Sequence, residues 1–268
     1  MPGPLDLHRL DGRVAVVTGA ASGIGAATCD VLAAAGASIV AADRDLDGAR
    51  ATVERVGAES SARAVAVATD VTRRADVEQM VATAIDTFGR VDIVANVAGA
   101  MFPGLIEDLT DDVIDRGIDL NLKGVLYGTQ YAIRAMKGQG SGAIVNVSSA
   151  AIDQPYDGIG VYAFTKAAVA MLTMTAAKEA GPYGIRVNAI APGTTITPFT
   201  TWRLTNPDGS RNTEAYDAFV AQMKESSPLG MAGEALDQAM LIHYLVSDAA
   251  RFATGNIFRV NGGQCMAW

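Results

Sequence analysis

Short apolar runs rich in valine, isoleucine and alanine recur along the chain, and stretches of helical composition separate them. The runs lie at 13–18, 38–43, 62–68, 91–96, 142–148, 185–191 and 256–260. Strands that alternate with helices in this way predict parallel strands joined by crossover helices. Several runs are almost continuously apolar, which is typical of strands covered on both faces. The pattern therefore predicts an α/β fold, a doubly wound parallel sheet with helices on both faces.

One region, 194–228, interrupts this alternation. It shows no clear strand and only a weak helical pattern around Glu214 to Lys224. Long irregular insertions in compact domains are usually functional or disordered. Its apolar and aromatic residues, among them Phe199, Trp202 and Tyr216, argue against disorder. Because the region directly follows a strand end, we interpret it as a substrate lid, with a purely structural excursion as the alternative.

Composition restricts the classes of function. A chain of 268 residues without a linker-like stretch is expected to form one domain over 1–268. Its net charge of −8 and its lack of a basic block argue against nucleic-acid binding. No run approaches the ~18 uncharged apolar residues of a membrane helix, so we expect a cytoplasmic protein without a membrane partner. Cys29 and Cys265 lack metal-ligand spacing, and no metal site or disulfide framework is expected.

A glycine-rich turn, TGAASGIG at 18–25, follows the first strand and precedes a helical stretch. Glycines at 19, 23 and 25 would let the backbone approach a pyrophosphate, and the helix N-terminus favours its negative charge. The spacing differs from the common G-x-G-x-x-G pattern, and such a turn alone is only a tight connection about half the time. The turn is a candidate phosphate cradle that needs support from elsewhere in the chain.

Asp43 supplies that support from the end of the second predicted strand. A carboxylate there can accept hydrogen bonds from an adenosine ribose, and it repels a 2′-phosphate. Position 22 is serine, so no basic residue in the turn would receive that phosphate, although Arg44 weakens this inference. The alternative role for Asp43 is a helix cap, but Asp45 is equally well placed for it. The sequence therefore favours NAD over NADP.

Tyr162 and Lys166 form the candidate proton-transfer pair. Residues four apart on a helix share one face, so the ammonium of Lys166 can lie near the phenol of Tyr162. The pKa of a free tyrosine is near ~10, and a cation a few Å away lowers it by roughly 1 to 3 units. Taken alone, the pair is more often an aromatic ring packed against a lysine stem. Ser149, at the end of a predicted strand, makes a catalytic interpretation the better one.

Taken together, TGAASGIG, Asn96-Val97-Ala98-Gly99, Asn121, Ser149, Tyr162-x-x-x-Lys166 and Pro192-Gly193 resemble the short-chain dehydrogenase/reductase family over essentially the whole chain. The resemblance implies a Rossmann-like fold with Tyr162 as general acid/base and Lys166 lowering its pKa and holding the nicotinamide ribose. It implies that Ser149 binds the substrate oxygen and that Asn121 helps anchor a water-mediated proton path. Ser148 is the competing serine, but Ser149 has the family spacing.

The resemblance also implies a nucleotide pocket. Its expected members are Gly19, Ser22, Gly23, Ile24, Gly25, Asp43, Asp70, Val71, Asn96, Ala98, Gly99, Tyr162, Lys166, Pro192, Gly193, Thr195 and Thr197. Asp70 and Val71 would lie near adenine, and Pro192 to Thr197 around the nicotinamide. Two positions depart from the family pattern, Val97 in place of a second asparagine and Thr195 in place of Ile or Val. Neither departure removes a reacting group.

These residues predict an NAD-dependent interconversion of a secondary alcohol and a ketone. The apolar lid, with Ile152, Pro155 and Tyr156, favours a hydrophobic or cyclic substrate such as a steroid or terpenoid. Two alternatives are a 3-oxoacyl-(acyl-carrier-protein) reductase and a non-catalytic nucleotide sensor or scaffold. The segment 161–180 is apolar almost all round, which predicts burial on more than one side and a homo-oligomer. The family resemblance implies a tetramer.

Overall fold

The computed structural model describes residues 3–206 and 208–266, and parallel strands form its central sheet. Within these residues the sheet has seven strands in the order β3-β2-β1-β4-β5-β6-β9. All pairings are parallel. The strands are β1 Val14–Thr18, β2 Ser38–Asp43, β3 Ala64–Ala68, β4 Ile93–Asn96, β5 Gly142–Val147, β6 Ile185–Ile190 and β9 Ile257–Phe258. Every predicted apolar run contains one of them, and the predicted doubly wound sheet is confirmed.

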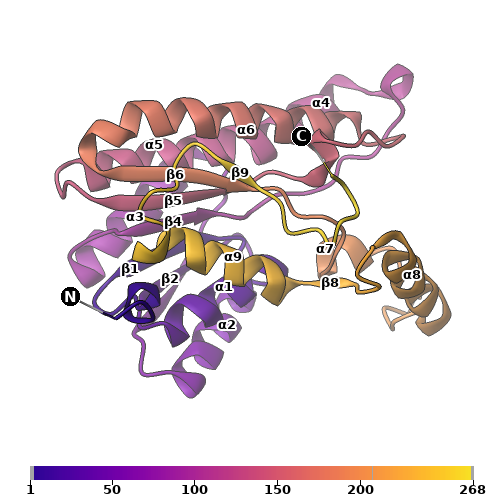
Figure 1. Cartoon of the computed structure of the whole chain (residues 1–268). Helices are drawn as coiled ribbons and strands as arrows, with labels where there is room; N and C mark the ends of the chain where they lie inside the picture. Colours follow the sequence, from indigo (N-terminus) through magenta and orange to yellow (C-terminus); the bar gives the residue numbers. More distant parts are fainter. Residues whose placement is uncertain (1–2, 207, 267–268) are drawn as a thin grey trace.

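Helices cover both faces of this sheet (Figure 1). One face carries α1 Gly23–Ala34, α2 Leu46–Glu59 and α9 Ala235–Val246, and the other carries α3 Arg74–Phe88, α5 Gly124–Lys137 and α6 Gly160–Ala180. The remaining α-helices are α4 Asp111–Ile118, α7 Pro198–Thr201 and α8 Thr213–Ser226. Short 3₁₀ turns lie at Asp6–His8, Ile106–Asp108, Ala150–Ile152, Gly181–Tyr183 and Asp248–Ala250, and a π-helical segment, Asp119–Lys123, joins α4 to α5.

The side-chain alternation of the strands divides the interior into two cores. Along β1, Ala15 and Val17 face α1, α2 and α9, whereas Val14 and Val16 face α3, α5 and α6. Both sets are buried, which explains why the strands read as continuous apolar runs.

The strand order reverses at β1, which pairs with β2 on one side and with β4 on the other. In open α/β sheets the connections at the carboxyl ends of the strands diverge at such a point and leave a crevice. Both the glycine-rich turn after β1 and the segment after β4 leave the sheet here. The sheet topology alone therefore predicts a site at the carboxyl ends of β1 and β4.

The predicted lid region contains more regular structure than its sequence indicates. The helix expected around Glu214 to Lys224 is present as α8, but β7 Thr195–Ile196 was not predicted. It pairs in parallel with β8 Gly233–Glu234. A two-residue strand gives no periodic signal, because its pairing is decided by a partner far along the chain. In Figure 1, α8 stands to one side of the sheet, beyond α7.

Helix α6 differs from the expectation that no run approaches the length and composition of a membrane helix. The segment Gly160–Tyr183 is long and apolar enough, by length and composition, to cross a membrane. A core helix can have the same length and composition, and α6 packs in the core with Ala176, Ala177 and Ala180. Its other side exposes Phe164, Met171 and Met174. The chain covers only part of the surface of α6, and the part that stays uncovered is also apolar.

Candidate active site

A cavity of about 1010 Å³ opens at the carboxyl ends of the strands. The segments that follow β1, β2, β3, β4, β5 and β6 all contribute to its wall, together with the start of α6. Every predicted cofactor residue except Asn96 lines it, as do Ser149, Tyr162 and Lys166. The sequence motifs, which are spread along the chain, therefore converge on one site.

The glycine-rich turn forms the floor of one end. A β-carbon at Gly25 would overlap the carbonyl oxygen of Gly19, so the turn can fold this tightly only with glycine there. Ser22 is the N-cap residue of α1, and its hydroxyl makes no capping hydrogen bond within the described chain. The turn thus presents a helix N-terminus and an uncommitted hydroxyl to the cavity, which suits a pyrophosphate.

Asp43 lies at the end of β2, beside this turn. One carboxylate oxygen accepts a hydrogen bond from the amide of Ala21 at 3.0 Å, and the other accepts one from the amide of Asp45 at 2.9 Å. Asp45, not Asp43, caps α2, because its carboxylate accepts from the amide of Gly48 at 3.0 Å. The helix-cap alternative for Asp43 is therefore wrong. Its carboxylate is held at the cavity wall, where a ribose hydroxyl can donate to it.

Asp70, Val71, Ala98 and Gly99 lie along the cavity as expected, but Asn96 does not. Asn96 has the same strand parity as Val94, so its side chain points away from the cavity, toward α5. There its amide donates to the Oδ1 atom of Asn146 at 2.8 Å. The side chain of Asn96 therefore belongs to the polar interior of the sheet, and the expected contact of this residue with the cofactor stays a prediction.

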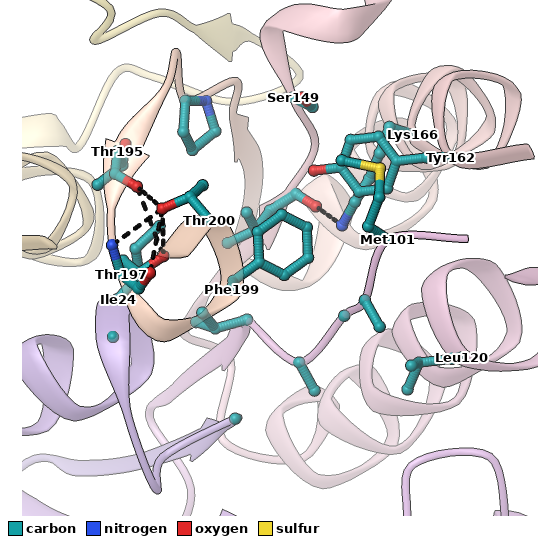
Figure 2. A pocket seen from close by; sticks show the side chains of 18 of the residues that line it. Ile24, Met101, Leu120, Ser149, Tyr162, Lys166, Thr195, Thr197, Phe199 and Thr200 are labelled. Atoms are coloured by element: carbon teal, nitrogen blue, oxygen red, sulfur yellow. Dashed lines mark hydrogen bonds between the residues drawn. The ribbon is translucent and has the colours of Figure 1, made fainter. Parts of the chain in front are cut away.

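Tyr162 and Lys166 project from the first turns of α6, and Ser149 follows β5 (Figure 2). The ammonium of Lys166 lies 5.6 Å from the centroid of the Tyr162 ring and donates to the carbonyl oxygen of Val147 at 2.8 Å. Ser149 is the serine that faces the tyrosine, whereas the hydroxyl of Ser148 donates to the carbonyl oxygen of Lys166 at 2.9 Å. The structure thus assigns different surroundings to the two serines.

Burial controls the titration of this pair. It lowers the pKa of Lys166 to about 8. It also raises the pKa of Tyr162, and the neighbouring hydroxyl of Ser149 acts in the opposite, lowering direction. In the chain alone burial is the dominant cause for both groups, and the ammonium of Lys166 is directed at the carbonyl oxygen of Val147. Without nucleotide, the phenol is therefore neutral near pH 7.

Asn121 lies in the π-helical segment between α4 and α5, and it is completely buried. Its amide makes two hydrogen bonds with the backbone of Ala100, accepting from the amide and donating to the carbonyl, each at 2.9 Å. A β-carbon at Gly99 would lie 3.0 Å from Asn121 Oδ1 and 3.3 Å from Lys166 Nζ. Asn121 therefore lies behind the cavity wall and fixes the segment 99–100, which separates it from Lys166. π-helical segments often occur at functional sites.

The segment after β6 forms the opposite wall. Figure 2 shows Thr195, Thr197 and Thr200 joined by hydrogen bonds, with the hydroxyl of Thr200 donating to the carbonyl oxygen of Thr195 at 2.7 Å. Phe199 closes this wall against the catalytic side, its ring centroid 5.9 Å from that of Tyr162. These hydrogen bonds hold the backbone of the loop that lines the cavity. The loop is therefore ordered even though Thr195 replaces the Ile or Val of the family pattern.

Several cavity residues were not predicted. Among them are Met101, Phe102, Pro103, Val113, Arg116, Leu120, Gln264 and Cys265. Met101 to Pro103 directly follow the Asn-x-x-Gly segment, and that position along the chain could have identified them. Gln264 and Cys265 carry no such signal, because they reach the site from beyond the last strand.

Comparison with known proteins agrees with this geometry. The sequence model described as short chain dehydrogenase matches residues 13–207. Trans-4-hydroxycyclohexanecarboxylate dehydrogenase of Sinomonas cyclohexanicum is 35% identical over 96% of this chain and 94% of its own length. A 3-alpha-(or 20-beta)-hydroxysteroid dehydrogenase of Mycobacterium bovis is 36% identical over 95% of this chain and 90% of its own length.

Solved structures are similar over almost the whole chain. A 7 alpha-hydroxysteroid dehydrogenase in complex with NADH and 7-oxo glycochenodeoxycholic acid superposes with a TM-score of 0.88 at 30% identity, covering 98% of both chains. Levodione reductase gives a TM-score of 0.88 at 32% identity, covering 97% of this chain and all of that one. With a family match over most of its length and full-length relatives of this identity, the chain belongs to the short-chain dehydrogenase/reductase family of oxidoreductases.

Proposed function

We propose that the protein interconverts a secondary alcohol and a ketone with NAD as the preferred cofactor. The observation that carries the cofactor preference is the Asp43 carboxylate, fixed at the cavity wall by the amides of Ala21 and Asp45. A second charge on a ribose 2′-phosphate would lie against this carboxylate. Bound NAD would accept or deliver the hydride, and the chain would hold it with the glycine turn, Asp43, Lys166 and the Pro192 to Thr197 loop.

The proton would be moved by Tyr162. In oxidation its ionised phenol takes the alcohol proton, and in reduction its neutral phenol donates a proton to the oxygen of the new alcohol. Ser149 is placed beside the phenol and would hold the same oxygen. Lys166 would hold the nicotinamide ribose and supply positive charge near the phenol. Asn121 supports the site from behind by fixing Ala100, and its role in a proton path belongs to this proposal.

We infer a carbon-rich, cyclic substrate from the wall around Tyr162. Met101, Phe102 and Phe199 line the cavity there, and Tyr156 is partly exposed at the same site. Two relatives named above are dehydrogenases of ring alcohols, and a similar solved structure holds a steroid ketone. The 194–228 region is proposed as the lid, with its β7 and α7 portion already lining the cavity.

A panel of cyclic and linear secondary alcohols, each offered with NAD and with NADP and monitored by absorbance of the reduced nucleotide, tests this function. We expect turnover of at least one cyclic alcohol, with NAD preferred by at least ~10-fold in kcat/KM. Equal or better rates with NADP would contradict the cofactor assignment. Binding of NADH without turnover of any alcohol or ketone would favour the sensor alternative.

The assembly proposal rests on the outer surface of α6. Phe164, Met171 and Met174 are exposed there, and Leu126 is exposed on the neighbouring α5. We propose that this apolar surface packs against a second copy of the chain in a homo-oligomer, which the family resemblance suggests is a tetramer. We also propose that the chain forms one domain and acts on small molecules in the cytoplasm. Light scattering should give a multiple of the chain mass at micromolar concentration, and Met171→Asp should lower it.

A further inference from the structure

Gln264 connects two parts of the site that are distant in sequence. Its Oε1 atom accepts a hydrogen bond from the amide of Thr194 at 3.0 Å. Its Nε2 atom donates to the carbonyl oxygen of Met223 at 3.4 Å and to the hydroxyl of Ser226 at 3.1 Å. Thr194 lies in the loop after β6, and Met223 and Ser226 lie in the last turn of α8. One side chain thus joins the cavity wall to the lid helix.

The partners fix the orientation of this amide. The backbone amide of Thr194 can only donate, and the carbonyl of Met223 can only accept. A reversed amide would satisfy neither contact. A glutamate would keep the acceptor for Thr194 but would lose the donor for Met223. The position therefore needs a side chain that carries one acceptor and one donor at this length, which glutamine provides.

The C-terminal segment is built to hold Gln264 in this place. Asn261 closes a turn by donating to the carbonyl oxygen of Cys265 at 2.6 Å and accepting from the amide of Gly263 at 3.0 Å. Ser227, the C-cap of α8, donates to the carbonyl oxygen of Gly262 at 3.0 Å. In Figure 1 this yellow segment leaves β9 and passes α7 and β8.

The loop after β6 is adapted to the same approach. A β-carbon at Gly193 would lie 2.6 Å from the β-carbon of Asn261 and 2.8 Å from Oε1 of Gln264. Any larger residue at position 193 would push the C-terminal turn away from Thr194. Glycine at this position therefore has a local reason in this chain, which is to admit the turn that carries Gln264.

We propose that Gln264 is a positioning residue that couples the lid helix α8 to the loop expected to receive the nicotinamide. This proposal rests on the proposed function, because it assigns the Pro192 to Thr197 loop to the nucleotide. Described residues of α8 do not themselves line the cavity, so a bound nucleotide would act on α8 through contacts such as those of Gln264. Because coupling is reciprocal, nucleotide that orders the loop also holds α8, and a released α8 weakens nucleotide binding.

Limited trypsin digestion measures this coupling. Arg203 and Arg211 are exposed cleavage sites in the segment before α8. In the wild-type protein we expect saturating NADH to slow cleavage there by about 5-fold, the scale of one or two hydrogen bonds between exposed groups. In Gln264→Ala the unliganded protein should be cut faster and NADH protection should fall to less than about 2-fold. The thermal midpoint should stay within about 2 °C of wild type.

Two further variants complete the test. Gln264→Glu keeps the acceptor for Thr194 but loses the donor to α8. We therefore expect the same loss of protection at α8 and, because coupling is reciprocal, NADH affinity weakened by a similar factor. Gln222→Ala, at an exposed position of α8, is the matched control and should be protected like wild type. Equal protection in both Gln264 variants and the control would overturn the proposal. Failure of the wild-type protein to bind NADH would contradict the proposed function instead. In that case the cleavage rates of Gln264→Ala and wild type without NADH would still show whether Gln264 holds α8.

Discussion

The hydroxyl of Ser148 donates a hydrogen bond to the backbone carbonyl of Lys166 at 2.9 Å, which ties the end of β5 to the catalytic helix α6. Ser149, the next residue, has its hydroxyl beside the phenol of Tyr162. Successive residues of an extended segment point in opposite directions, so one serine serves the packing and the other faces the site.

This difference predicts opposite phenotypes for two conservative changes. Ser149→Ala should lower kcat/KM by about 10²-fold, because it removes a donor to the reacting oxygen. Its loss of stability should not exceed the ~1 kcal/mol of the cap that its hydroxyl provides to the amide of Ala151. Ser148→Ala should retain most of the turnover and lose about 1 kcal/mol of stability, because a buried hydrogen bond is lost. Steady-state kinetics and thermal unfolding of both variants measure the contrast. Equal losses of turnover would contradict the assignment.

The pKa of Tyr162 gives a pH prediction. Burial holds this pKa above its ordinary value, so the ionised base needed for oxidation increases with pH, while the neutral acid needed for reduction is already present. We expect kcat/KM for alcohol oxidation to rise with pH up to about 8, where Lys166 begins to lose its proton, while ketone reduction stays nearly flat over the same range. Tyr162→Phe should lose about 10³-fold in both directions and still bind NADH. A flat oxidation profile, or near-normal turnover of this variant, would refute the role of the phenol.

Sequence reasoning succeeded where a local pattern determines the structure. The apolar runs predicted a parallel sheet covered on both faces, and the structure contains it. The four-residue spacing of Tyr162 and Lys166 predicted that they share one helix face, and both side chains line the cavity. The face that Asn96 occupies is not available from sequence, because both faces of β4 are buried and strand parity alone does not say which of them carries Asn96.

The remaining features depend on contacts that no local pattern encodes. Gln264 reaches Thr194 only because the chain returns past α8, and the pairing of β7 with β8 has the same origin. The direction of the Tyr162 pKa in the chain alone does not follow from sequence, because sequence shows the neighbouring charge but not how deeply both groups are buried. Desolvation depends on the whole fold, and it dominates here.

Asp43 and Asp45 offer a matched pair for the cofactor assignment. Asp43→Ala should lower kcat/KM with NAD by about 10-fold and narrow the preference over NADP, because the ribose loses its acceptor and the repulsion disappears. Asp45→Ala should cost about 1 kcal/mol of stability through the lost cap of α2 and leave the preference unchanged. Kinetics with both nucleotides decide between them. An unchanged preference in Asp43→Ala would contradict a ribose contact.

An ion pair holds the turn that follows the catalytic serine. Asp153 ends the 3₁₀ turn capped by Ser149, and its carboxylate accepts from Nε and Nη2 of Arg259 at 2.6 and 2.7 Å. The side chain of Asp153 is only 9% exposed, so loss of its partner leaves a largely buried charge. The pKa of Arg259 is raised, mainly by its hydrogen bond with Asp153.

We therefore expect Arg259→Met to destabilise the protein by about 2 kcal/mol, more than the ~0 to 1 kcal/mol typical of exposed pairs. The double variant Asp153→Asn with Arg259→Met should recover part of that loss, because the uncompensated carboxylate is gone. Urea unfolding of the two single variants and the double variant yields the coupling energy. Strictly additive losses would show that the pair is a surface contact, and that packing alone holds the turn beneath Ser149.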